Sequence, residues 1–159
     1  MEIKLKQDPL VTALVGKMTT KLDSRIAFFG ATDELSCHLM KVRSLVENQD
    51  VKEEILTIVK TLSNVMGEVA GSKFKLSINE VKWIVSLVKK YEHNDGKLTQ
   101  FVIPGQNVVS ADIHIARCVA RRAELAYAKV YKDHGGSDYI FEYLNKISSL
   151  LFAIALMHE

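Results

Sequence analysis

The sequence predicts an all-α protein, a bundle of about five helices in a single domain over residues 1–159. Two observations support this prediction. Only 2 prolines and 8 glycines occur among the 159 residues, so few positions would interrupt a helix. Apolar residues also recur at intervals of three and four along much of the chain, which is the period of a helix with one buried face.

Composition excludes several classes of protein. The chain is 48% hydrophobic and 25% charged, which is typical of a globular domain and not of a disordered one. Its 21 Lys and Arg against 19 Asp and Glu leave a net charge of +2, so no basic excess indicates nucleic acid. The longest apolar run, residues 150–157, is far shorter than the roughly 18 residues that a membrane span needs. We expect a cytoplasmic protein, since the N-terminus does not resemble a signal peptide.

The first helix is expected to begin at Thr32, an N-cap candidate followed by the acids Asp33 and Glu34. Residues before it look irregular or weakly extended. A second helix is expected over about residues 51–69, with Gly71 as its C-cap.

The remaining helices are expected over three segments. Ser77 and Glu80 have the spacing of a capping box and open the third helix, which ends near residues 94–96. A short extended loop, residues 101–105, follows, because the residue before a proline avoids the helical region. The fourth helix covers about residues 108–132 and the fifth about residues 137–157.

One polar stripe runs along the fourth helix. His114, Arg117, Arg121 and Glu124 are spaced by three, four and three residues, so they share one face. Spacing leaves two interpretations open. The stripe is either a solvated face with an Arg121–Glu124 ion pair, or an anion site in which the arginines bind phosphate while Glu124 orients Arg121.

Other sites are excluded by their missing motifs. No Glu-x-x-His occurs, so a ferritin-like di-iron bundle is rejected. Neither a P-loop, a dinucleotide fingerprint nor a nucleophile elbow occurs. The two cysteines, Cys37 and Cys118, lack metal spacing, and we expect reduced, mostly buried thiols. No metal site is predicted.

Several motifs resemble one family, the ATP:cob(I)alamin adenosyltransferases of the propanediol-utilisation type. The matching segments keep their spacing over nearly the whole chain. They are Phe28–Leu35, Phe101–Gly105, Asp112–Arg117, Arg121–Glu124 and Tyr143–Phe152.

The resemblance implies a five-helix bundle that forms a homotrimer with its sites between subunits. It implies transfer of the 5′-deoxyadenosyl group of ATP to cob(I)alamin, with release of triphosphate. Mg²⁺ accompanies the nucleotide, and a reductase is a further expected partner.

The resemblance also assigns roles to residues. Arg117 and Arg121 are implied in catalysis together with Asp33, which pairs with Arg117 across the interface. The aromatic ring of Phe101 is implied to occupy the lower face of the corrin. The residues implied in nucleotide binding are Arg122, Glu124, Asn145, Asp8 and Thr12. Taken without the family, Phe101 could plug the bundle end, Asp33 could complement a helix dipole, and Asn145 could be an interhelical hydrogen bonder.

The sequence departs from the family mainly in the N-terminal nucleotide loop. Gln7 and Leu10 replace two glycines that let a backbone approach phosphate, and Pro9 removes an N–H donor. Leu125 and Ser149 each replace a charged residue. Three functions therefore stay open: a working adenosyltransferase, a noncatalytic homologue that binds a corrinoid or nucleotide as carrier, sensor or scaffold, and an oligomeric helical protein that binds neither.

Overall fold

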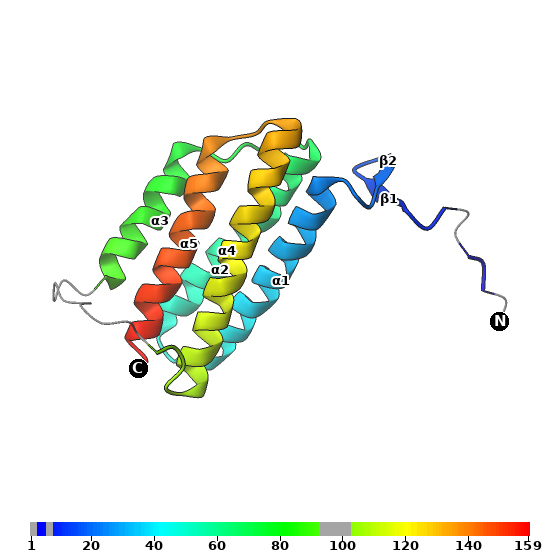
Figure 1. Cartoon of the computed structure of the whole chain (residues 1–159). Coiled ribbons are helices and arrows are strands. Elements are labelled where there is room, and N and C mark those ends of the chain that lie inside the picture. The colour runs from blue at the N-terminus through cyan, green and yellow to red at the C-terminus, as the bar shows by residue number, and fades with distance from the viewer. Residues whose placement is uncertain (1–2, 6–7, 93–102) are drawn as a thin grey trace.

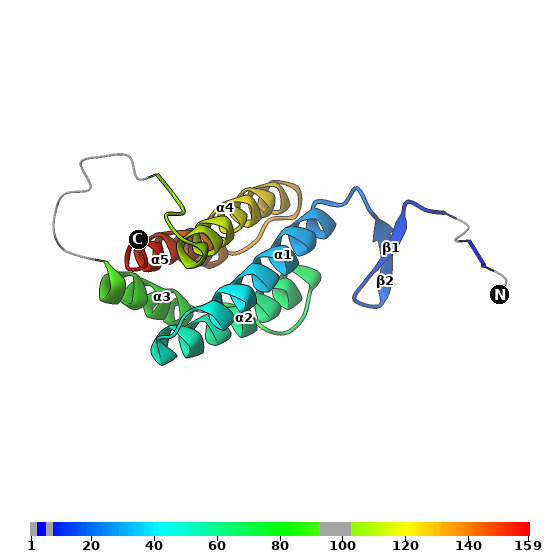
Figure 2. The ribbon, with the colours of Figure 1, turned by 90° about the horizontal axis from the view of Figure 1, so that it is seen from below.

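The computed structural model describes residues 3–5, 8–92 and 103–159, and its described part is a bundle of five helices (Figure 1). The expected all-α architecture is confirmed. In chain order the helices are α1 (Ser24–Leu45), α2 (Gln49–Ala70), α3 (Ile78–Tyr91), α4 (Val108–His134) and α5 (Asp138–Leu156). Helix α1 packs between α2 and α4, and α5 packs between α4 and α3 (Figure 2).

The core is one continuous cluster of apolar side chains from all five helices. Tyr127 of α4 is fully buried in it, with its ring 5.4 Å from that of Phe28 and 4.8 Å from that of Phe141. The Tyr127 hydroxyl accepts from the Ser137 N–H at 2.8 Å and donates to the Ser137 carbonyl at 3.0 Å. This one side chain therefore ties the end of α4 to the start of α5.

The first helix begins nine residues earlier than the sequence indicated. Asp23, not Thr32, is the N-cap of α1, and its carboxylate accepts from the Arg25 N–H at 2.9 Å. Thr32 is buried inside the helix, where its hydroxyl donates to the Phe28 carbonyl at 2.8 Å. A threonine inside a helix can satisfy its hydroxyl in this way. Because threonine is also common at N-caps, Thr32 led to a wrong prediction of where the helix begins.

A β-hairpin precedes α1, in place of the irregular segment that we expected. Strands β1 (Val11–Leu14) and β2 (Lys17–Thr20) are antiparallel. Val15 and Gly16 form the two-residue turn, both with positive φ, as hairpin turns matched to strand twist require. The hairpin projects beyond the start of α1, outside the bundle (Figures 1 and 2).

The other helix ends agree with the sequence to within a few residues. Gly71 caps α2 in the left-handed region, with φ of 99°. Glu80 completes the capping box by accepting from the Ser77 N–H at 2.9 Å. Helix α3 ends at Tyr91 with Glu92 as its C-cap, a few residues before the expected end at residues 94–96. Phe101 lies outside the described residues.

Helix α5 has the length and apolar character of a membrane span, and it is the one such helix in the described part of the chain. Its apolar side chains face the bundle, where Tyr143, Leu144 and Ile147 are fully buried. Burial of this kind is typical of the core helix of a globular protein.

We expect Asp23→Ala to lower the free energy of unfolding by about 1 kcal/mol at neutral pH, the usual cost of losing an N-cap. The Arg25 guanidinium, 2.7 Å from the Asp23 carboxylate, holds the pKa of that carboxyl well below its usual range. A carboxyl with a lowered folded-state pKa stabilises the protein above its unfolded-state pKa of about 4, and this contribution is lost as the pH falls below that value.

The stability difference between wild type and Asp23→Ala should therefore shrink between pH 7 and pH 3, as measured by urea unfolding. Asp133→Ala is the control, because Asp133 is exposed at the end of α4 and has no ion pair in the described structure. An equal difference at both pH values would contradict the role of the Asp23 charge.

Candidate functional site

The three arginines predicted from the sequence lie on α4 but point in different directions. Consecutive residues of a helix are about 100° apart, so the Arg121 and Arg122 side chains leave α4 in different directions. The Arg122 guanidinium lies 2.6 Å from the Glu34 carboxylate of α1. Toward α5, the Arg117 guanidinium lies over the ring of Phe152, 5.8 Å from its centroid.

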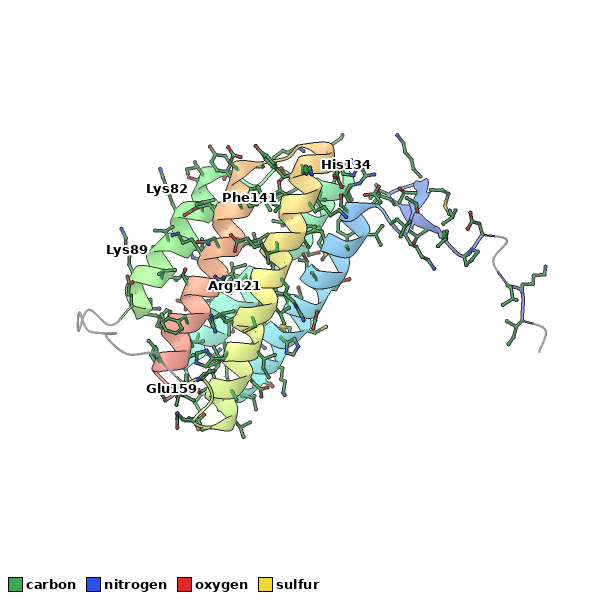
Figure 3. The ribbon with its side chains drawn as sticks, in the orientation of Figure 1. Lys82, Lys89, Arg121, His134, Phe141 and Glu159 are labelled. Atoms are coloured by element: carbon green, nitrogen blue, oxygen red, sulfur yellow. The ribbon has the colours of Figure 1, made fainter. Side chains whose placement is uncertain are left out.

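Arg121 is exposed, as Arg122 is, and lies at mid-length of α4 (Figure 3). It makes no ion pair with any residue that the structure describes. The expected Arg121–Glu124 pair is therefore absent there, and Glu124 instead accepts from the Asn145 amide at 3.3 Å. The structure thus joins Glu124 and Asn145, two of the predicted nucleotide residues, and leaves the Arg121 guanidinium free to bind an anion.

The N-terminal part of the polar stripe is not solvated, contrary to the simpler of the two interpretations. His114 is buried, and its Nε2 atom lies 3.1 Å from a Glu159 carboxylate oxygen. The Nδ1 atom of His114 and the Nε atom of Arg117 are both buried without a hydrogen-bond partner among the described residues. Buried polar atoms usually have partners, so two such atoms one turn apart single out this region.

A groove of about 520 Å³ follows the outer side of α4 at the same level. Arg117, Arg122 and Glu34 supply its charged lining, and Pro104, from the loop before α4, forms one end. The other lining residues are Ala111, His114, Ile115, Cys118 and Val119. The groove thus brings two of the predicted arginines together with the loop that follows Phe101. Phe101 itself lies outside the described residues.

Asp33 does not meet Arg117 within one chain. It is exposed on α1 and has no ion pair in the described structure, so the implied pairing across an interface stays a prediction. Cys37 on α1 and Cys118 on α4 are also exposed, and our expectation of mostly buried thiols is wrong. Each cysteine lies on the side of its helix that faces away from the bundle core, which their sequence context did not reveal.

The predicted N-terminal residues lie in or beside the hairpin, at a distance from the arginines. The Asp8 carboxylate accepts from the Leu10 N–H at 2.9 Å, and Thr12 pairs with Thr19 between β1 and β2. Because the hairpin projects past the start of α1 (Figure 1), Asp8 and Thr12 do not join Arg121 in a single subunit.

Sequence reasoning missed three partners of the site. Glu34 pairs with Arg122, Phe152 lies under Arg117, and Glu159 contacts His114. These contacts link residues that are 35 to 88 positions apart, so no local spacing indicated them. Phe152 and Glu34 each lie within a segment that matches the family, which was the available signal for these two partners.

Metal-binding potential of the described residues is low. They contain no group of three or more His, Cys, Asp and Glu side chains that could hold an ion. The arrangement of exposed and half-buried guanidinium groups is suited to phosphate oxygens, which arginine binds through paired hydrogen bonds.

Comparison with known proteins identifies relatives over nearly the full chain. The family model described as cobalamin adenosyltransferase matches residues 7–158. A corrinoid adenosyltransferase of Bacillus subtilis is 29% identical over 152 residues, covering 91% of this chain and 79% of the relative. A corrinoid adenosyltransferase of Citrobacter freundii is 28% identical over 156 residues, covering 93% of this chain and 89% of the relative.

Solved structures share the same fold. A PduO-type ATP:corrinoid adenosyltransferase variant from Lactobacillus reuteri, complexed with ATP, aligns with a TM-score of 0.83 over 94% of this chain and 89% of that one, at 24% identity. A second variant of that protein, complexed with cobalamin and ATP, aligns with a TM-score of 0.81 over 92% of this chain and 86% of that one, also at 24% identity. The family model matches residues 7–158, and the chain therefore belongs to the cobalamin adenosyltransferase family.

Proposed function

We propose that this protein transfers the 5′-deoxyadenosyl group of ATP to the cobalt of a reduced corrinoid, which gives adenosylcobalamin and triphosphate. The family match over residues 7–158 and the corrinoid adenosyltransferases among its relatives support this activity. The observation that carries it is the groove along α4, where Arg117 and Arg122 lie beside the loop that follows Phe101.

The reaction places modest demands on the protein. Cob(I)alamin cobalt is itself a strong nucleophile, so the cobalt–carbon bond forms as the bond between C5′ and the triphosphate oxygen breaks. The protein must hold C5′ against cobalt and stabilise the charge that develops on the leaving triphosphate. Guanidinium groups provide that stabilisation, and they are the groups that α4 presents.

Each site residue has a distinct role in this proposal. Arg121 and Arg122 bind the triphosphate, and the Glu124–Asn145 pair, joined at 3.3 Å, orients the nucleotide. Arg117 acts at the boundary between nucleotide and corrinoid, with Asp33 of a neighbouring subunit as its partner. Phe101 covers the lower face of the corrin, where an apolar ring excludes water without offering a ligand.

The complete site requires a second subunit in this proposal. The hairpin region exposes Leu10, Val15, Met18 and Leu22 to solvent, and exposed apolar residues gathered in this way are typical of an interface. A homotrimer would cover them and bring Asp8 and Thr12 of one subunit to the arginines of another. On α4, Ile115 and Leu125 are exposed as well.

The remaining components follow from the chemistry. Mg²⁺ enters with ATP and is held mainly by the phosphates, in keeping with the lack of a metal-binding cluster among the described residues. A reductase supplies the cob(I) state of the corrinoid. We place the protein in the cytoplasm, where ATP and reductant are both present.

The test is an activity assay with cob(I)alamin, generated by a strong reductant, and Mg-ATP. We expect light-sensitive adenosylcobalamin, seen as a change in the visible spectrum that requires ATP and the protein. The same sample, examined by size-exclusion chromatography with light scattering, should contain trimers.

A negative assay from intact trimers would overturn the catalytic proposal. Binding of cob(II)alamin or ATP without turnover would then identify a carrier, sensor or scaffold, the outcome that the altered N-terminal loop would explain. Binding can be measured as a rise in melting temperature, since a ligand that binds only the folded protein stabilises it.

A further inference from the structure

The carboxylate of Glu159 joins the segment after α5 to the first turns of α4 (Figure 3). Its Oε1 atom accepts from the Ser110 hydroxyl at 2.7 Å and lies 3.1 Å from His114 Nε2. These contacts lower the pKa of the Glu159 carboxyl, first through Ser110 and also through His114 and the backbone of Gly105 and Gln106. The side chain is therefore held as an anion by both α4 and the loop before it.

The backbone beside Glu159 ties down the same loop. The His158 carbonyl accepts from the Asn107 amide, and the Asn107 side-chain oxygen caps α4 by accepting from the Ser110 N–H at 3.0 Å. Gly105 adopts a φ of +90°, and a Cβ at this position would lie 3.2 Å from the Ala111 Cβ. Residues 103–107 are thus packed closely on α4 and fastened to it at two points.

Both elements that Glu159 holds line the groove, although Glu159 does not. Pro104 comes from the loop and His114 from α4, and they border the groove together with Arg117. His114 has no other hydrogen-bond partner among the described residues. Removing the carboxylate would therefore release the imidazole and the loop together.

We propose that Glu159 is a positioning residue for the corrinoid: it fixes His114 and the loop of residues 103–107 so that this end of the groove fits the substrate. The inference rests on the proposed function. Glu159 acts at the first turns of α4, whereas Arg121, Glu124 and Asn145 lie two to three turns further along the bundle. Corrinoid affinity should therefore depend on Glu159, and ATP affinity should not.

The test compares Glu159→Ala and Glu159→Gln in the full chain. We expect Glu159→Ala to raise the KM for the corrinoid about tenfold, the scale of one charge-assisted hydrogen bond, with the KM for ATP changed less than about twofold. Glu159→Gln keeps an acceptor for Ser110 and His114 but loses the charge, and its corrinoid KM should lie between those of the other two proteins.

The matched control is Glu142→Gln. Glu142 lies on α5, and its carboxylate makes a surface ion pair with Lys146 at 3.3 Å. Such pairs contribute little to stability. This variant should leave both KM values unchanged. If Glu159→Ala does not fold, the comparison of Glu159→Gln with Glu142→Gln keeps the test decisive.

A second measurement is independent of activity. Amide hydrogen exchange of the ligand-free protein should become faster in Glu159→Ala at residues 103–114 and stay unchanged in α2 and α3. Faster exchange there supports the positioning role even if wild type forms no product, an outcome that would overturn only the proposed function. Equal rises in both KM values, or unchanged exchange, would overturn the inference.

Discussion

Arg121→Ala is expected to lower kcat/KM for adenosyl transfer by about 10²- to 10³-fold, the usual cost of removing one donor that stabilises a developing negative charge. Arg121 is exposed and has no ion pair within the described residues, so its guanidinium is available to the triphosphate. The loss should appear in the initial rate of adenosylcobalamin formation, while circular dichroism and trimer content stay those of wild type.

Two variants sharpen this prediction. Arg121→Lys keeps the charge but loses the planar guanidinium, so its rate should lie between wild type and Arg121→Ala. Lys89→Ala removes an exposed cation of α3, on a different side of the bundle (Figure 3), and should leave the rate unchanged. A near-normal rate for Arg121→Ala would contradict the proposed triphosphate site.

Substitution of Arg122 would test the proposed triphosphate site less directly. Its guanidinium is 2.6 Å from Glu34, so its removal also breaks a link between α4 and α1. Arg117 is half-buried over Phe152, and its truncation would disturb packing as well as charge. The exposed position of Arg121 separates the chemical role from the structural one.

The sequence predicted a helix end well where a capping residue close by in the chain determines that end. Gly71 and the Ser77–Glu80 capping box act within one turn of the chain, so their sequence spacing was sufficient. The start of α1 was mispredicted because Thr32, Asp33 and Glu34 imitate an N-terminus. Residues 24–31, which follow the true N-cap Asp23, include Phe28, Phe29 and Gly30, and their helical pattern is weaker.

The site was predictable only as far as one helix defines it. The spacing of Arg117, Arg121 and Glu124 placed them correctly on α4. Whether Glu124 meets Arg121 or Asn145 depends on how α5 packs, which a single-helix argument cannot include. The contact between His114 and Glu159 spans 45 residues and likewise follows from tertiary packing alone.

The largest expected effect on stability is that of Phe28→Ala. The Phe28 side chain is fully buried in α1, with its ring 5.4 Å from that of Tyr127. Truncating a buried phenylalanine removes apolar contacts and leaves a cavity, so the free energy of unfolding should fall by about 3–5 kcal/mol. Urea unfolding at matched protein concentration would measure this, since the stability of an oligomer depends on concentration.

The matched control is Phe29→Ala, because the adjacent ring is only half-buried. This substitution should lower the free energy of unfolding by about 1–2 kcal/mol, in proportion to the apolar area that the ring buries. The comparison also tests where α1 begins. A helix that already includes residues 28 and 29 directs Phe28 into the core and Phe29 about 100° away from it. If residues 24–31 were an irregular segment, the two substitutions would have similar, small effects, and the contact between α1 and Tyr127 would not exist.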